Sequence, residues 1–206
     1  MGLNLIIANA DGSLDKKQSV IKRAFASASQ TAQELLQLDK VDVVCISNKV
    51  YVIPEIGIGG FTPSRHLTYL YIDPAAEINE SEIFNTLCHE FHHARRYDGP
   101  GYGNTLFDSI IFEGLATAFE NEVSGGKAFI SSTLRKRKNT RQLINKCKPH
   151  FNDTDFDHFK WFIRDKSGEL PRWSGYEMGY FIVREQLAKQ NKKASDLVLE
   201  SPRNFE

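Results

Sequence analysis

His89, Glu90 and His93 form the pattern H-E-x-x-H, and Glu113 follows in the next predicted helix. Residues four apart on a helix lie on one face, with Cβ atoms about 5–6 Å apart. His89 and His93 can therefore each give a ring nitrogen to one Zn²⁺ at about 2.0–2.1 Å, and Glu113 can give a carboxylate oxygen as the third ligand. This spacing indicates a catalytic zinc site.

Three protein ligands leave one tetrahedral position for water, whose pKa zinc lowers to about 7. Glu90 follows His89 directly and points to a neighbouring face of the helix. It lies too far round to be a ligand, yet close enough to accept a proton from that water. Glu90 is therefore the predicted general base.

A chance copy of H-E-x-x-H would lie on a solvated helix face. Here the motif helix has its own start signal and is apolar on its other faces. Glu113 lies in the apolar run from Ser109 to Ala116, where a carboxylate is costly to bury unless it is paired or binds a metal. These features favour the metal site over the solvated face.

The chain has 206 residues, 41% of them hydrophobic, and a formal net charge of zero. This size and composition predict a single domain over residues 1–206. The zero net charge gives no sign of a nucleic-acid partner. The amino terminus lacks the basic region of a signal peptide, and no apolar run approaches a membrane span. Three scattered cysteines fit a reducing compartment, so the expected location is the cytoplasm.

Hydrophobic periodicity predicts alternating strands and helices in the first part of the chain. The strand Leu67–Asp73 alternates, with Leu67, Tyr69 and Tyr71 on one face, and is predicted to be half-buried and at a sheet edge. The other predicted elements there are strands at 3–8 and 41–46, a helix capped by Ser13 and ending near Leu38, a short partner strand at 49–53 and a glycine-rich loop at 57–63.

The later part of the chain is predicted to be mainly helical. Asn79 to Glu82 form a capping box that opens the motif helix, which ends near Tyr97. The Glu113 helix runs from about 104 to 124, and an amphipathic helix runs from about 175 to 190. The basic stretch 135–148 is interpreted as a solvated face, with an acidic substrate or nucleic acid as the minor alternative.

These motifs resemble those of the predicted Zn-dependent proteases of the DUF2268 (YjaZ-like) family, in the gluzincin group. The resemblance rests on three pieces, Thr86–Arg95, Leu106–Ala116 and Leu170–Val183. It implies a zincin-like α+β fold with a small twisted mixed sheet, a support helix, the motif helix, the ligand-Glu helix and a helical carboxy-terminal part. In zincins an edge strand binds an extended peptide substrate, a role that the resemblance gives to Leu67–Asp73.

The resemblance also implies an oxyanion donor beyond the third ligand. Tyr176 is the preferred residue, because it shares a face with Gly179, which allows close packing. Tyr180, His150 and His158 remain alternatives. His92 is expected at the surface or in support of a ligand, and Asp108 or Glu120 is expected to orient a histidine.

The sequence therefore favours a metallopeptidase that uses Zn²⁺ and acts on a peptide or protein. Two alternatives stay open: a zinc hydrolase of a non-peptide amide, and a zinc-stabilised binding protein with little turnover.

Overall fold

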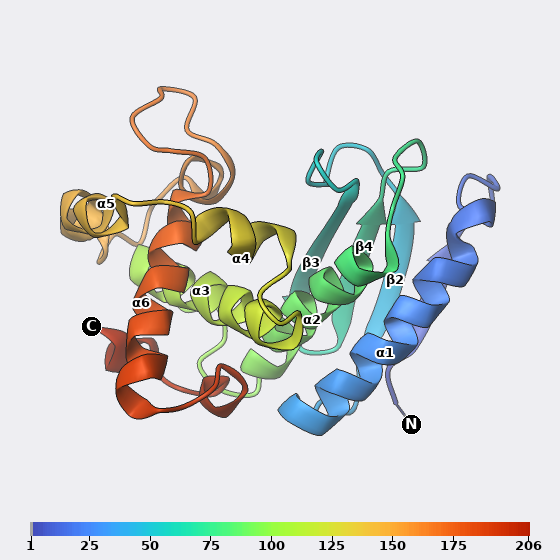
Figure 1. The fold of residues 1–206 in the computed structure, drawn as a ribbon, viewed down its shortest axis with the longest axis horizontal. Helices are drawn as coiled ribbons and strands as arrows, with labels where there is room; N and C mark the ends of the chain where they lie inside the picture. Colours follow the sequence, from blue (N-terminus) through green and yellow to red (C-terminus); the bar gives the residue numbers. More distant parts are fainter. Residues whose placement is uncertain (1) are drawn as a thin grey trace.

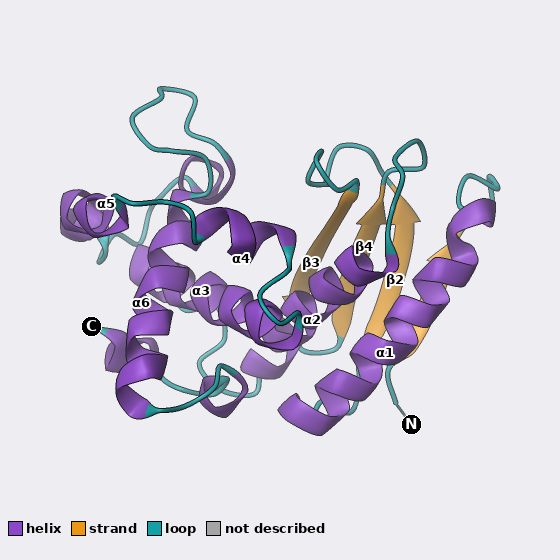
Figure 2. Ribbon diagram, in the orientation of Figure 1, coloured by secondary structure: helices purple, strands orange, loops and turns teal. Residues whose placement is uncertain are grey.

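The computed structural model describes residues 2–206 and places a four-stranded mixed sheet beside a group of helices (Figure 1, Figure 2). The strands are β1 (Asn4–Ala8), β2 (Asp42–Ser47), β3 (Ile58–Ser64) and β4 (Leu67–Ile72). Their order in the sheet is β1-β2-β4-β3, with β1, β2 and β4 parallel and β3 antiparallel to β4. The α+β class and the small mixed sheet are confirmed, whereas the zincin-like layout and the single domain over residues 1–206 stay predictions.

Four long helices dominate the rest of the chain. They are α1 (Gln18–Leu36), α2 (Glu80–Arg96), α3 (Leu106–Val123) and α6 (Ser174–Gln190). The shorter helical segments are α4 (Phe129–Leu134), α5 (Thr140–Cys147), the π-helical turn η3 (Phe159–Ile163) and the 3₁₀ turns at Asp15–Lys17, Lys148–His150, Ser195–Leu197 and Pro202–Phe205.

The helices α1 and α2 lie on the same face of the sheet, and α3 packs beyond α2 (Figure 1). Alternation along β4 explains this layering. Thr68, Leu70 and Ile72 are fully buried, whereas the residues between them are only half-buried. Because successive strand residues point to opposite faces, one face of β4 packs on helices and the other stays partly open. The half-buried strand is confirmed.

The predicted edge position of β4 is wrong. β4 pairs with β2 on one side and with β3 on the other, so Leu67–Asp73 lies inside the sheet. Alternating burial reports how the two faces are covered, and it carries no information on whether both sides of the strand are paired. The edge strand next to α2 is β3.

The predicted loop at 57–63 is also wrong, since Ile58–Ser64 forms β3. Glycines are depleted in strands, but a glycine in a strand often marks a place where another group approaches closely. Both glycines of β3 fit this rule, because a Cβ on Gly59 would lie 2.0 Å from the Tyr51 carbonyl oxygen and one on Gly60 would lie 2.5 Å from Glu90. The predicted strand at 49–53 reduces to an isolated bridge between Ile53 and Ile58.

The helix starts are partly as predicted. Ser13 does not cap α1, because its backbone N–H and hydroxyl both donate to Asp11, and α1 begins at Gln18 after a 3₁₀ turn. Asn79 does cap α2, since its side chain accepts from the Glu82 N–H at 2.8 Å. A reciprocal capping box of Thr105 and Asp108 opens α3.

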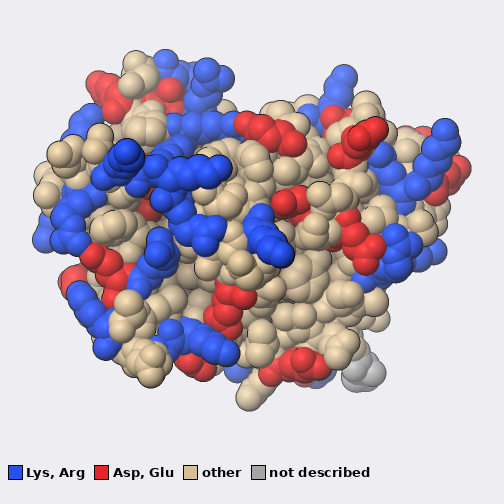
Figure 3. Space-filling view, in the orientation of Figure 1, with Lys and Arg blue, Asp and Glu red and all other residues tan. Residues whose placement is uncertain are grey.

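Many basic side chains gather over the part of the molecule that contains α4 and α5 (Figure 3). Several of them make contacts within the chain. Arg137 pairs with the buried Glu177 of α6, and Arg141 pairs with Glu185 of the same helix. These pairs join α5 and its preceding turn to α6, which gives part of the stretch 135–148 a structural role.

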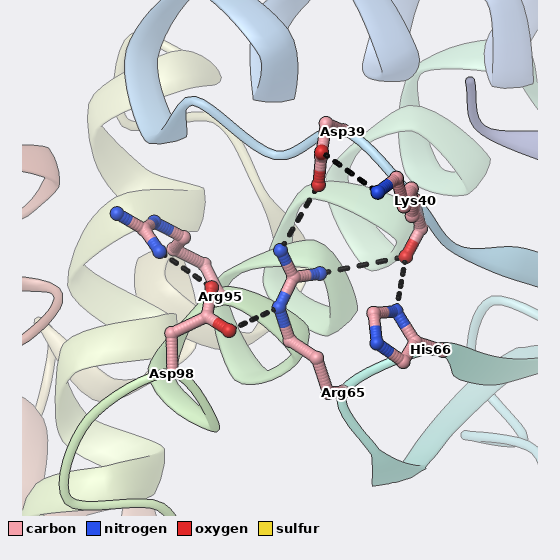
Figure 4. A network of polar contacts seen from close by, with 6 residues as sticks. All are labelled: Asp39, Lys40, Arg65, His66, Arg95 and Asp98. Atoms are coloured by element: carbon pink, nitrogen blue, oxygen red, sulfur yellow. Dashed lines mark hydrogen bonds and ion pairs between the residues drawn. The ribbon is translucent and has the colours of Figure 1, made fainter. Parts of the chain in front are cut away.

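A polar network around Arg65 joins three segments of the sheet half of the molecule (Figure 4). Arg65 lies in the turn between β3 and β4, and it donates to Asp98 at 2.6 Å and to Asp39 at 3.2 Å. Asp98 follows α2, and Asp39 lies between α1 and β2. The network therefore fixes the β3–β4 turn relative to both helices that cover the sheet.

Within residues 2–206, no helix combines the length and apolar character needed to cross a lipid bilayer. Cys45, Cys88 and Cys147 are buried and unpaired in this part of the chain. Burial raises the pKa of the Cys45 thiol to about 12, which keeps that thiol protonated.

Candidate metal centre

Two imidazoles of α2 and one carboxylate of α3 converge at one point. His89 Nε2 lies 3.2 Å from Glu113 Oε2, and His93 Nε2 lies 3.3 Å from the same oxygen. The three possible ligand atoms all lie within 4.8 Å of one another. The helical spacing therefore brings His89 and His93 together as predicted, and α3 brings Glu113 to them.

Local packing fixes the two imidazole rings in different ways. The His93 ring stacks on Phe112 of α3, with centroids 4.1 Å apart and planes at 5°. The His89 ring meets His93 edge to face at 4.6 Å. Because His93 is held between its own helix and α3, the packing of α2 on α3 sets where its nitrogen points.

The helix α3 is apolar almost all round, and its few buried polar side chains lie along one face. They are Ser109, Glu113, Thr117 and Glu120, at spacings of four, four and three residues. Because the helix is apolar on its other sides, these polar side chains depend on partners within the protein. Glu113 and Glu120 find theirs on α2, at His89.

Charge compensation explains how Glu113 is buried. Burial by itself would raise the pKa of this carboxyl, but the neighbouring His93 and His89 outweigh burial and lower the pKa below its ordinary value. Burial would likewise lower the pKa of His89, yet hydrogen bonding to Glu113 and Glu120 raises that pKa to about 10. The imidazoles and carboxylates of this cluster therefore offset the cost of burying one another.

Glu90 lies beneath the edge strand β3 and is 5% exposed. The Thr62 hydroxyl donates to Glu90 Oε2 at 2.7 Å, and the Thr68 hydroxyl lies 2.8 Å from that of Thr62. Burial raises the pKa of Glu90, against the opposing charges of His93 and His89 and the Thr62 hydrogen bond. One carboxylate oxygen is thus anchored to the sheet.

Glu120 is the carboxylate that backs a candidate ligand. Its Oε2 lies 3.6 Å from His89 Nδ1, on the opposite side of the ring from Glu113. The other expected candidate, Asp108, has its carboxylate on the backbone N–H groups of Asn104 and Thr105 instead. Glu120 follows Glu113 by seven residues, which is two helical turns, so both lie on one face of the helix. This spacing is the sequence signal that distinguishes Glu120 from Asp108.

The four expected oxyanion donors divide into two pairs. Tyr176 and His158 line the same cavity as His89 and Glu90, whereas Tyr180 and His150 do not. The Tyr176 ring lies 6.2 Å from the His89 ring. His150 pairs with Asp153 at an exposed position, and the Tyr180 hydroxyl is buried without a partner among residues 2–206.

The position of Tyr176 depends on a close helix crossing. A Cβ on Gly179 would lie 2.1 Å from the Ile110 carbonyl oxygen, and one on Gly114 would lie 2.3 Å from the backbone of Gly179. The two glycines thus let α6 approach α3 more closely than any larger residue would permit. The prediction that Gly179 allows close packing is confirmed.

The cavity has a volume of about 710 Å³. It runs between β3, α2 and the start of α6, and His89, Glu90 and Glu120 lie on its wall. Most of the other lining residues are apolar. This volume lies within the range of about 300–1,000 Å³ that is typical of ligand pockets.

His92 and Thr62 add to the sequence analysis. His92 is fully buried against Phe119, so the surface alternative is wrong and the alternative that it supports a ligand stays a prediction; burial lowers its pKa well below the ordinary value. Thr62 was missed because it falls in the segment predicted to be a loop. Its signal was the two-residue spacing of Ile58, Gly60 and Thr62, which puts all three on one strand face.

The family model described as "Predicted Zn-dependent protease (DUF2268)" matches residues 19–206. The match includes α2, α3 and α6 and therefore every residue of the candidate metal centre. No curated protein and no solved structure matches the chain.

Proposed function

The chain belongs to the DUF2268 family of predicted Zn-dependent proteases, and from this we propose that it is a zinc metallopeptidase of the gluzincin type. His89, His93 and Glu113 hold the metal in this proposal. The observation that carries it is the convergence of two imidazole nitrogens and one carboxylate oxygen within 4.8 Å.

The donor set suits zinc. Two nitrogens and one oxygen are the ligands of many catalytic zinc sites, which keep a further position for water or substrate. When bound, zinc lowers the pKa of water and polarises a carbonyl group. Glu120 supports the fit, because a ligating histidine commonly has a carboxylate at its other ring nitrogen.

Glu90 is the proposed general base. Thr62 occupies Oε2, so Oε1 is the atom left to accept a proton from the attacking water and to pass it to the leaving nitrogen. Gly60 lies against this oxygen, because a Cβ at position 60 would lie only 2.5 Å from Glu90 Oε1. A larger residue would therefore clash with the oxygen that accepts the proton. A raised pKa is the direction expected for a base that must later act as an acid.

Tyr176 is the proposed oxyanion donor. Burial and the charges of Glu113 and Glu90 raise the pKa of its hydroxyl well above the ordinary value, so the proton stays on the oxygen and can be donated. His158 is the second candidate, because it lines the same cavity.

We propose that the edge strand β3 has the substrate role that the family resemblance implied for Leu67–Asp73. In β3 the Ile58 carbonyl accepts from Ile53 on the outer side, and alternate residues of an antiparallel pair point their backbone groups the same way. Gly60 therefore presents its N–H and C=O outward, beside Glu90. An extended peptide that pairs with Gly60 would pass directly over the general base.

The proposed zincin-like arrangement is this combination of edge strand, motif helix and ligand-Glu helix. The cytoplasmic location stays a prediction.

The test begins with metal content. The purified protein should hold about one Zn²⁺ per chain, and His93→Ala or Glu113→Ala should weaken binding sharply. His150→Ala is the control, because this exposed histidine pairs with Asp153 and lies outside the cavity. Full zinc occupancy in a His89→Ala/His93→Ala double variant contradicts the ligand assignment.

Glu90→Gln then tests the chemistry. It should retain zinc and fold while turnover of any cleaved peptide falls by about 10²–10⁴-fold, because the amide cannot accept the proton. Unchanged turnover contradicts the role of Glu90. If the zinc-loaded wild-type protein cuts no peptide, the non-peptide amide and the binding-protein alternatives replace the peptidase.

A further inference from the structure

The exposed apolar side chains of this protein are concentrated around one cavity. Eight large apolar side chains are exposed in residues 2–206. Five of these eight line the cavity that contains His89 and Glu90, namely Val50, Tyr51, Phe61, Phe159 and Ile163. Single exposed apolar residues need no explanation, but a contiguous group at a cavity mouth marks a binding surface.

These side chains come from two segments far apart in the sequence, which form two walls. The first wall is the segment 50–61, which leads into and includes part of β3. The second wall is the π-helical turn η3, where Phe159 is 48% and Ile163 is 41% exposed. π-Helical turns are rare and occur frequently at functional sites.

Each wall makes contacts with another part of the chain. In η3, Trp161 and Phe162 are buried in an apolar cluster with α3 and α6, so the turn is not a free loop. In the first wall, Glu55 forms an ion pair with Arg172, and the Arg172 guanidinium lies 3.8 Å from the centre of the Trp173 ring. The second wall is therefore packed on the core, and the first wall is joined to the start of α6 by an ion pair.

The second wall also contacts the proposed catalytic group. The Phe162 ring packs edge to face on Tyr176, with centroids 5.7 Å apart. Trp173, Phe129 and Ile130 continue the apolar lining toward the start of α6. The apolar surface is thus continuous with the candidate metal centre.

The charge of the lining is as informative as its hydrophobicity. Among the described residues that line the cavity there is no lysine, arginine or aspartate. The carboxylates present are Glu90 and Glu120, and both already have partners, Thr62 and His89. The two charged residues within the walls, Glu55 and Lys160, already pair with Arg172 and Glu169. A charged substrate side chain placed against the apolar lining would therefore lose its water without an unpaired counter-charge, which is costly.

We propose that the cavity binds an extended, uncharged peptide segment with bulky apolar side chains on both sides of the bond to be cleaved. This proposal rests on the proposed function. Side chains of an extended segment alternate in direction. A strand paired with Gly60 would therefore send its side chains toward the two walls, and apolar side chains would bury the surface that is exposed in the free protein.

Peptide binding to the Glu90→Gln protein tests this without relying on turnover. Matched peptides carry leucine or phenylalanine, or else lysine or aspartate, at the positions flanking one bond. The apolar peptides should bind at least about tenfold more tightly than the charged ones, also after zinc is removed with a chelator. Equal binding, or tighter binding of the charged peptides, overturns the proposal.

Charge introduced into each wall gives the matched test. Val50→Asp and Ile163→Asp should each weaken binding of the apolar peptides by about tenfold and improve binding of the lysine peptides. The control is Leu35→Asp, which changes another exposed apolar side chain, on α1 and outside the cavity. An equal effect of the control, with all three variants folded by circular dichroism, overturns the proposal.

Turnover separates this proposal from the proposed function. If the zinc-loaded wild-type protein cleaves apolar and charged peptides equally well, the peptidase assignment stands and the apolar selection is wrong. If apolar peptides bind selectively but none is cleaved, the selection stands and the peptidase assignment is wrong.

Discussion

Glu120 Oε2 lies 3.6 Å from Nδ1 of the candidate ligand His89, and the Glu120 side chain is 7% exposed. A buried carboxylate is costly unless it is compensated, and the compensation here is the His89 ring. His89 thus has a carboxylate on each side, Glu113 at Nε2 and Glu120 at Nδ1. In the proposed metal site, Glu120 at Nδ1 would leave Nε2 as the nitrogen that binds the metal, so we propose Glu120 as a positioning residue.

Glu120→Gln keeps the size of the side chain and removes its charge. We expect zinc affinity to fall by about 10–100-fold, because His89 loses the partner that orients it and raises its basicity. Competition with a chromophoric chelator measures the affinity. Glu122→Gln is the control, since Glu122 lies on the same helix but accepts from the Ala194 and Ser195 backbone. Equal affinities for Glu120→Gln and the wild type would show that the carboxylate does not act on His89.

Tyr176→Phe removes the proposed oxyanion donor and leaves the ring in place. We expect kcat to fall by about 10²-fold with little change in KM, because the hydrogen bond matters mainly in the transition state. Tyr180→Phe is the control, one turn along the same helix and outside the cavity. Steady-state kinetics on a cleaved peptide measure both constants. A change in KM alone moves the role to His158.

At the scale of the elements, the helices that carry the site could be predicted from sequence and the edge strand could not. Asn79 and the apolar face of α2 are local signals, and the spacing of His89 and His93 acts through one helical turn. Strand order depends on contacts between distant segments. The alternation of Leu67–Ile72 therefore gave its burial correctly, but not its position inside the sheet.

The glycines of β3 explain why a loop was predicted at 57–63, where the structure has a strand. Gly59 and Gly60 have poor strand propensity, so local reasoning assigns them to a loop. The structure needs them in a strand because the Tyr51 backbone lies against one and the Glu90 side chain against the other. Both approaching groups belong to other segments of the chain, and no local pattern reports them. Thr62, the partner of Glu90, lies in the same strand and was therefore not predicted as part of the site.

The crossing of α3 and α6 gives a prediction at the same scale. Gly179→Ala would gain about 1 kcal/mol of intrinsic helix propensity. Its methyl group would lie 2.1 Å from the Ile110 carbonyl oxygen, so the helices must separate. Overpacking of this kind costs about 1–3 kcal/mol or more, and we expect net destabilisation.

Urea unfolding measures the effect of Gly179→Ala. The matched control is Lys189→Ala on the same helix, at an exposed position where the change should stay within about 0.5 kcal/mol. A Gly179→Ala protein as stable as the wild type would mean that the close approach of α6 to α3 is not required for folding.

At the scale of the whole molecule, the network around Arg65 joins the sheet to both helices that cover it (Figure 4). Asp98 accepts from Arg65 and from Arg95, and its side chain is 31% exposed. Partial burial would raise the pKa of Asp98, but the two arginines outweigh it and hold the pKa below the ordinary value of 3.8. Asp98 is therefore a source of pH-dependent stability outside the metal centre.

The lowered pKa of Asp98 sets the direction in which stability changes with pH. A carboxyl whose pKa is lowered on folding stabilises the protein above its ordinary pKa, and this stabilisation is lost as the pH falls through the lower, folded pKa. Asp98→Asn should therefore reduce the free energy of unfolding at pH 7 by about 0.2–1 kcal/mol, the range for partly exposed pairs, and by less at high salt.

The deficit in the free energy of unfolding should shrink as the pH falls below 3.8. Urea unfolding of the variant and the wild type from pH 7 to pH 2.5 measures it, with the exposed Asp155→Asn as control. A deficit that persists unchanged at low pH would assign the effect to packing at Asp98 and not to its charge.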